Sequence, residues 1–225
     1  MPITNIYCSN VPRATATARE IEEVLKKLWI ETSFKIRNMF WYFDERYFPP
    51  EINKEFLKHK ASWEEEDKFV EDFLDGKWEN KPETLAIEYI KMLKAFFNRV
   101  NNVIKKDFSI IAFRHWDKSS DGNLSELWKK QAKELWQKLS KEKYDEDVML
   151  IATHNIINES IIRCLISKDD LPQERRKPLA HTETVKYTFH PSEEKENLYM
   201  EIEWRNTKVK IPYKKIEEVI KDLTK

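Results

Sequence analysis

The chain has 225 residues, of which 36% are charged and 40% hydrophobic, a size that suits one large domain or a domain with an appendage. Its 40 basic residues balance its 40 acidic ones, so no overall electric field would draw it to nucleic acid or to an anionic membrane. No apolar run reaches membrane-spanning length, and the N-terminus has no basic-then-apolar signal pattern. We therefore expect a cytoplasmic protein without nucleic-acid or membrane partners.

Cysteine and glycine are scarce, which limits the cofactor chemistry that the sequence can support. Cys8 and Cys164 have no CxxC spacing and are typical of small core residues in a reducing compartment. No pair of histidines or cysteines has metal-ligand spacing, and the two glycines form neither a Walker loop nor a dinucleotide fingerprint. We predict neither a metal nor a cofactor.

The first elements are predicted to be a strand and a helix joined by a polar turn. Residues 3–9 have the pattern of a strand, and residues 14–29 repeat apolar side chains at helical spacing. This order places Ser9, Asn10 and Arg13 at the carboxyl edge of a sheet, where α/β proteins bind ligands. A guanidinium there suits a phosphate or carboxylate, although an ordinary solvated arginine at a helix start is the simpler interpretation.

The middle of the chain is aromatic and then strongly charged. Residues 31–50 predict a strand followed by an aromatic loop, and residues 51–106 have a helical pattern in which Pro82 marks a helix start. We expect a helical insertion or lid at about 49–106.

The second half predicts further strands and helices. Short apolar runs indicate buried strands, apolar periodicity indicates helices, and alternation indicates antiparallel strands. The expected elements are buried strands at 109–113 and 148–153, a helix at 124–139, antiparallel strands within 181–191 and 198–211, and a helix at 214–225. Buried strands alternating with helices predict a single α/β domain with a mostly parallel sheet.

Three of the predicted strands are followed by polar groups suited to an anion. These groups are Ser9 to Arg13, Arg114 with His115, and the segment Thr153, His154 and Asn155. A shared parallel sheet would bring all three to one edge. One histidine at a strand end is usually structural, but two histidines with two arginines describe a phosphate pocket with an imidazole nucleophile.

Two of these segments carry a family resemblance. SNVPRATATA, beginning at Ser9, fits the S-x-x-x-R-A-x-x-T-A pattern of the histidine phosphatase (phosphoglycerate mutase-like) superfamily. VMLIATHNIINESIIRCLI resembles the second histidine element of that family. The resemblance covers residues 3–28 and 121–190. It implies a three-layer α/β/α domain over residues 1–225 with a mostly parallel central sheet.

The resemblance also implies a mechanism that needs no metal. In the family, a histidine from an R-H-G motif attacks phosphorus, and arginines with a second histidine neutralise the equatorial oxygens. By this resemblance Arg13 is a phosphate clamp and His154 is the second histidine. Ser9 and Asn155 join the phosphate-binding set, with the Asn155 amide standing where the family has glycine.

The chain departs from the family at the R-H-G motif, because it begins at the element that follows that strand. SIIAFRHW is the best candidate for the missing central strand, which would make His115 the nucleophile and Arg114 its partner. Trp116 then stands in place of the family glycine. The helix at 124–139 resembles both the family's first helix and the helix before the second histidine, and both alignments remain open.

A carboxylic acid must protonate the leaving oxygen, and the aromatic loop offers Glu45, with Asp44 in reserve. A solvated surface carboxylate is the simpler interpretation of either residue. The expected function is hydrolysis of a phosphorylated small molecule or phosphoprotein through a phosphohistidine. The alternative is a catalytically inactive fold that serves as a protein-binding scaffold, and a mutase is a weaker third hypothesis. No pattern indicates whether the chain forms a homo-oligomer.

Overall fold

The structure is a computed structural model that describes residues 3–8, 12–27, 33–36, 82–114, 130, 133–134, 137, 147–153, 155–166 and 183–225. Its strands and α-helices in chain order are β1 (Ile3–Cys8), α1 (Pro12–Lys27), β2 (Ser33–Ile36), α4 (Pro82–Arg99), β3 (Phe108–Arg114), β4 (Asp147–Thr153), α6 (Asn155–Leu165), β5 (Thr184–His190), β6 (Tyr199–Trp204), β7 (Thr207–Pro212) and α7 (Tyr213–Leu223). A π-helical turn follows α4, and a short 3-10 turn precedes β6. The two buried strands expected from their apolar runs are confirmed as β3 and β4.

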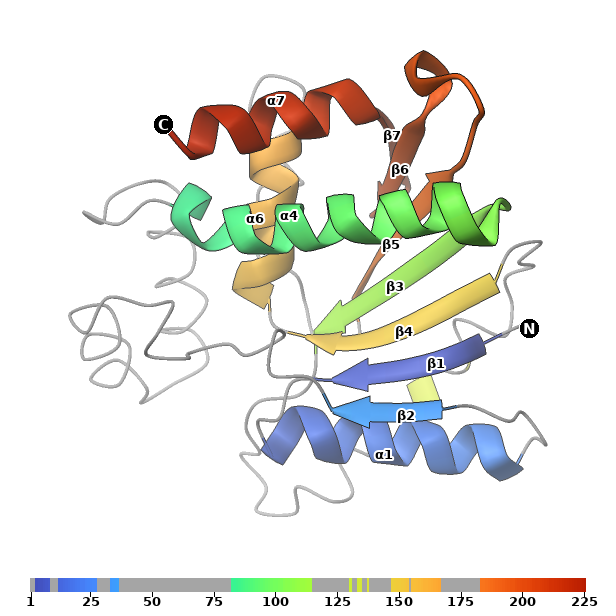
Figure 1. The fold of residues 1–225 in the computed structure, drawn as a ribbon. Helices are drawn as coiled ribbons and strands as arrows, with labels where there is room; N and C mark the ends of the chain where they lie inside the picture. The colour runs from blue at the N-terminus through green and yellow to red at the C-terminus, as the bar shows by residue number, and fades with distance from the viewer. Residues whose placement is uncertain are drawn as a thin grey trace, which may run out of the picture.

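The seven strands form one mixed sheet in the order β2-β1-β4-β3-β5-β6-β7 (Figure 1). The four strands from β2 to β3 run parallel to one another, and β5, β6 and β7 continue the sheet with antiparallel pairings. The expectation of a mostly parallel sheet therefore holds for one half only. In the other half, the two-residue turn Arg205-Asn206 joins β6 to β7, and so short a turn can connect only antiparallel strands.

The central strands β3 and β4 are apolar on both faces because helices cover both sides of the sheet. Along β3, Ile110 and Ala112 join the core beneath α4 and α6, whereas Ile111 and Phe113 join the core beneath α1. Successive side chains of a strand point to opposite faces, so a strand covered on both sides needs a continuous apolar run. This requirement explains the SIIAF sequence.

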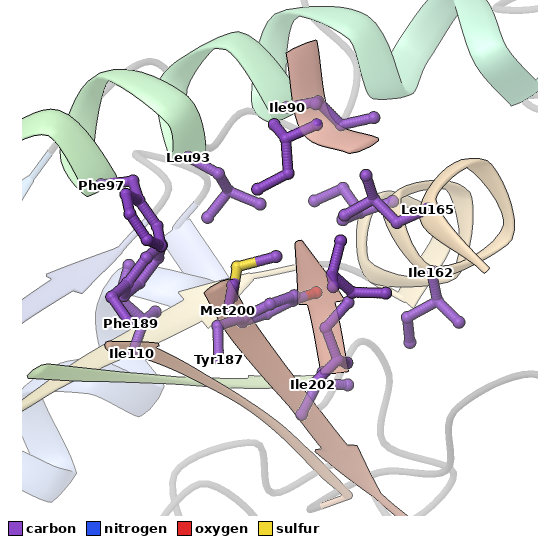
Figure 2. Close-up of a cluster of buried hydrophobic side chains, with 14 of the residues drawn as sticks. Ile90, Leu93, Phe97, Ile110, Ile162, Leu165, Tyr187, Phe189, Met200 and Ile202 are labelled. Carbon is purple, nitrogen blue, oxygen red and sulfur yellow. The ribbon is translucent and has the colours of Figure 1, made fainter. Parts of the chain in front are cut away.

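Helix α1 packs on one face of the sheet, and α4, α6 and α7 pack on the other (Figure 1). Helix α4 supplies Ile90, Leu93 and Phe97 at helical spacing, and all three are buried. Figure 2 shows these side chains directed toward Tyr187 and Phe189 of β5. Burying each such side chain contributes about 1.5–3 kcal/mol relative to leaving it in water.

Helix α4 begins at Pro82, as the sequence predicts, since proline is favoured in the first helical turn. The helix falls within the segment at about 49–106 that we expected to form an insertion or lid. Its apolar face belongs to the main core, and α4 packs against both α6 and α7. Residues 49–81 of the expected insertion lie outside the described residues. None of the described helices combines the length and apolar composition needed to cross a membrane.

Candidate functional site

The strands β1, β4 and β3 end side by side at one edge of the sheet. Cys8 of β1 pairs with Ala152 of β4, and Ala152 also pairs with Phe113 of β3. One residue further, Arg114 pairs with Thr153. Neighbouring strands are separated by about 4.8 Å, so three strand ends lie within about 10 Å of one another. The prediction that one edge would gather these strand ends is confirmed for the backbone.

Two helices begin at this same edge. Helix α1 starts at Pro12, four residues after the end of β1, and α6 starts at Asn155, two residues after the end of β4. The first N–H groups of a helix have no partner within the helix and carry partial positive charge. An edge at which two helices begin, one of them with Arg13 in its first turn, is therefore suited to an anion.

Three of the predicted site residues lie in described elements at this edge. Arg13 is the second residue of α1, Arg114 is the last residue of β3, and Asn155 is the first residue of α6. The structure thus brings their backbone positions to one edge of the sheet, although Arg13 is more than 100 residues from the other two in the sequence.

The remaining predicted residues lie outside the described residues, namely Ser9, Asp44, Glu45, His115 and His154. Arg114 of β3 and Thr153 of β4 are paired in the sheet. His115 directly follows Arg114 in the sequence, and His154 directly follows Thr153. Trp116, which stands in place of the family glycine, also lies outside the described part of the chain.

A contact between a buried thiol and a hydroxyl joins the end of β1 to the first turns of α1. The Cys8 thiol donates a hydrogen bond to Thr15 Oγ1 at 3.9 Å, and Cys8 is fully buried. Burial raises the pKa of the Cys8 thiol, although the Thr15 hydrogen bond and the charge of Arg19 act in the opposite direction. The thiol therefore remains protonated at neutral pH and serves as a packed core group.

An ion pair at the same edge was not anticipated from the sequence. Strand β5 begins where β3 ends, because Thr184 pairs with Phe113, and Glu183 directly precedes β5. Arg205 donates hydrogen bonds from Nε and Nη2 to the two carboxylate oxygens of Glu183, the second at 2.9 Å. The side chains of Arg205 and Glu183 are only 20% and 15% exposed, so this charge pair is largely removed from water.

The ion pair with Glu183 affects the pKa of Arg205. Desolvation lowers the pKa of the guanidinium, but the hydrogen bond and charge of Glu183, with a further contribution from the buried Glu159 of α6, outweigh it and raise the pKa overall. Arg205 and Asn206 both have positive φ, as in a tight turn. The pairing of Arg205 with Glu183 depends on the register of the strands, which cannot be predicted from the residues next to either one.

His190 lies at the opposite edge of the sheet. It ends β5, and its Nδ1 and Nε2 atoms each lie 2.9 Å from a carboxylate oxygen, of Asp107 and Glu201 respectively. Its ring also stacks on Tyr199, with centroids 4.4 Å apart. These contacts make His190 a structural residue of this sheet edge.

Within the described part of the chain, no group of three or more histidine, cysteine, aspartate and glutamate side chains is placed to hold a metal ion. Neither the models of known protein families nor the curated proteins contain a match to this chain.

Proposed function

We propose that this protein is a divergent histidine phosphatase with the phosphoglycerate mutase-like three-layer fold, and that it hydrolyses phosphomonoesters through a phosphohistidine. The observation that carries the proposal is the strand register. Three polar segments, predicted separately from the sequence, follow strands that end at one sheet edge, with Arg114 opposite Thr153. Two of these segments each lead into a helix that begins beside this edge, α1 in one case and α6 in the other.

The position of β3 supports His115 as the nucleophile. The family resemblance requires a central strand that is followed by Arg-His, and SIIAFRHW is the segment that offers one. Strand β3 ends in Arg114, lies between β4 and β5 in the sheet, and pairs with β4 over its whole length. A strand that occurs later in the chain can therefore occupy the central place in space.

The proposed reaction has two steps. The neutral imidazole of His115 attacks phosphorus, the bond to the leaving oxygen breaks, and Glu45 or Asp44 gives that oxygen a proton. Water then attacks the phosphohistidine, loses a proton to the same carboxylate, and releases phosphate with restoration of the histidine. Each step conserves charge and protons within the site, and neither requires a metal.

The remaining residues would bind the phosphoryl group. Its charge spreads over three oxygens, and several fixed donors are needed to stabilise it in the transition state. Arg13 and Arg114 would supply planar guanidinium groups, and His154 a third cationic or hydrogen-bonding group. Ser9 and the Asn155 amide would complete the set beside the starts of α1 and α6.

The substrate class follows from this chemistry as a phosphorylated small molecule or a phosphoprotein. We place the activity in the cytoplasm, and two cysteines that are not joined in a disulfide, Cys8 and Cys164, accord with a reducing compartment. Trp116 is the residue that favours the alternative of an inactive scaffold, because a bulky side chain at a glycine position would restrict the approach of a phosphate.

The test is hydrolysis of an aryl phosphate in the presence of EDTA by wild type, His115→Ala and His154→Ala. A matched control is His190→Gln, which removes a histidine from the opposite edge of the sheet, with folding of each variant verified by circular dichroism. Turnover that is lost in both site variants and kept in the control supports the proposal. Acid-labile phosphate on His115 after rapid quenching would identify the intermediate directly. A folded wild type without turnover from acid to neutral pH would instead favour the scaffold.

A further inference from the structure

The ion pair between Arg205 and Glu183 lies where the pairing of β5 with β6 ends. The register pairs of these strands end at Lys186 and Glu203, whereas β5 itself begins at Thr184. Glu183 directly precedes Thr184, and Arg205 directly follows the end of β6. The guanidinium of Arg205 donates to both carboxylate oxygens of Glu183. This two-bonded contact therefore holds the start of β5 against β6 beyond the last register pair.

The start of β5 is also a neighbour of the candidate site. Thr184 of β5 pairs with Phe113 of β3 in an antiparallel register. Continuing that register by one residue brings the backbone of Glu183 beside Arg114, the last residue of β3. A contact that fixes the backbone at Glu183 thus also limits where the end of β3 can lie.

A second carboxylate that acts on Arg205 belongs to α6. Glu159 is buried, and it lies about one helical turn after Asn155, the first residue of α6. Desolvation lowers the pKa of Arg205, but the hydrogen bond and charge of Glu183 and the charge of Glu159 raise it overall. The guanidinium is thus attracted to carboxylates of two segments beside the site, one preceding β5 and one on the helix that follows β4.

Arg205 is separated from the end of β3 by a whole strand. Strand β5 lies between β3 and β6 in the sheet (Figure 1), and neighbouring strands are about 4.8 Å apart, which places β6 about 10 Å from β3. The guanidinium is also engaged with Glu183. These two facts favour an indirect role over contact with a phosphate at the strand ends.

We propose that Arg205 is a positioning residue of the candidate site, which holds β5 and α6 in place around the ends of β3 and β4 by neutralising Glu183 and Glu159 together. Its effect on turnover rests on the proposed phosphatase function, whereas its effect on the backbone does not. Without the guanidinium, the two carboxylates would lose a shared counter-charge and repel each other in a region largely removed from water.

The first experiment compares the steady-state kinetics of variants with an aryl phosphate in EDTA. Arg205→Met should lower kcat by about 10–100-fold, because small displacements of a site are costly, while KM changes little. Arg205→Lys keeps the charge without the planar fork and should recover part of kcat. Adding Glu183→Gln to Arg205→Met should also recover part of it, because the repulsion between the carboxylates is removed.

The matched control is Lys106→Met, which breaks an ion pair at the opposite edge of the sheet. Lys106 Nζ lies 2.8 Å from Asp147 Oδ2, where β4 begins. This variant should keep the wild-type kcat. Folding of every variant is verified by circular dichroism at the assay temperature, and if Arg205→Met does not fold, Arg205→Lys takes its place in both experiments.

The second experiment does not need turnover. Relaxation dispersion of backbone amides detects microsecond-to-millisecond exchange, and we expect it at Arg114 and Asn155 in Arg205→Met but not in Lys106→Met. A folded Arg205→Met protein with wild-type kcat and without this exchange would overturn the proposal. If the wild type has no turnover, the phosphatase proposal fails, and the relaxation data alone decide whether Arg205 positions this edge: exchange confined to the Arg205 variant supports it, and its absence overturns it.

Discussion

Arg114 and Thr153 are register partners at the ends of the adjacent parallel strands β3 and β4. The residues that follow them in the chain are His115 and His154. A register slip of one residue would turn every side chain of a strand to the other face of the sheet, so the packing of both faces specifies this alignment strongly. The cores on the two faces therefore fix which residues end together at the candidate site.

We expect Arg114→Ala to lower kcat/KM for an aryl phosphate by about 10²–10³-fold, the usual effect of removing one fixed donor to a charged transition state. Arg114→Lys keeps the charge but loses the planar fork and should recover only part of the activity. Steady-state kinetics in EDTA measure the effect. Arg99→Ala, at the exposed end of α4, is the matched control. Full activity in Arg114→Ala would remove Arg114 from the site.

The core beneath α4 should be sensitive to the loss of Phe97. Its ring packs edge-on against Phe189, with ring centroids 5.4 Å apart, and lies tilted against Tyr213, with centroids 5.1 Å apart. The side chain is fully buried. We expect Phe97→Ala to lower the free energy of unfolding by about 3–5 kcal/mol, measured by denaturant titration. Val103→Ala is the control, because Val103 is 70% exposed and should change stability by less than about 0.5 kcal/mol. Similar losses in both variants would contradict the packing.

The turn between β6 and β7 should discriminate among side chains at position 206. Arg205 and Asn206 have φ values of 45° and 59°, so both occupy the left-handed region. A β-branched residue is strained there, and we expect Asn206→Val to lower the free energy of unfolding by about 1–2 kcal/mol. Asn206→Gly has no Cβ and should retain full stability. Thermal unfolding followed by circular dichroism compares the two, and an equal effect of both would be inconsistent with this backbone.

The two thiols should react at different rates. Burial raises the pKa of the Cys8 thiol, so its reactive thiolate form is scarce at pH 8, whereas Cys164 is partly exposed on α6. Mass spectrometry after iodoacetamide treatment should show modification at Cys164 before Cys8. In Cys164→Ala the folded protein should remain largely unmodified until denaturant is added. Rapid alkylation of Cys8 in that folded variant would contradict its burial.

Local elements could be predicted where one physical pattern dominates. The apolar runs of β3 and β4, the proline that starts α4 and the alternation along β5 each specify an element without reference to distant residues. The shared edge at which β1, β4 and β3 end was predicted as well, because strand ends follow from strand boundaries. The antiparallel strands expected within 181–191 and 198–211 are confirmed as β5, β6 and β7. The order of the strands in the sheet was not predicted, because it depends on which strands become neighbours.

The sequence by itself determined that two apolar runs are followed by Arg-His and Thr-His, because continuous burial requires such runs and polar residues terminate them. Only the tertiary structure decided that β3, late in the chain, lies between β4 and β5, and that Glu183 meets Arg205. Contacts between distant segments are chosen by burial of both sheet faces at once, in competition with the entropy of closing long loops. The balance between burial and loop-closure entropy therefore cannot be predicted from a short segment of the sequence.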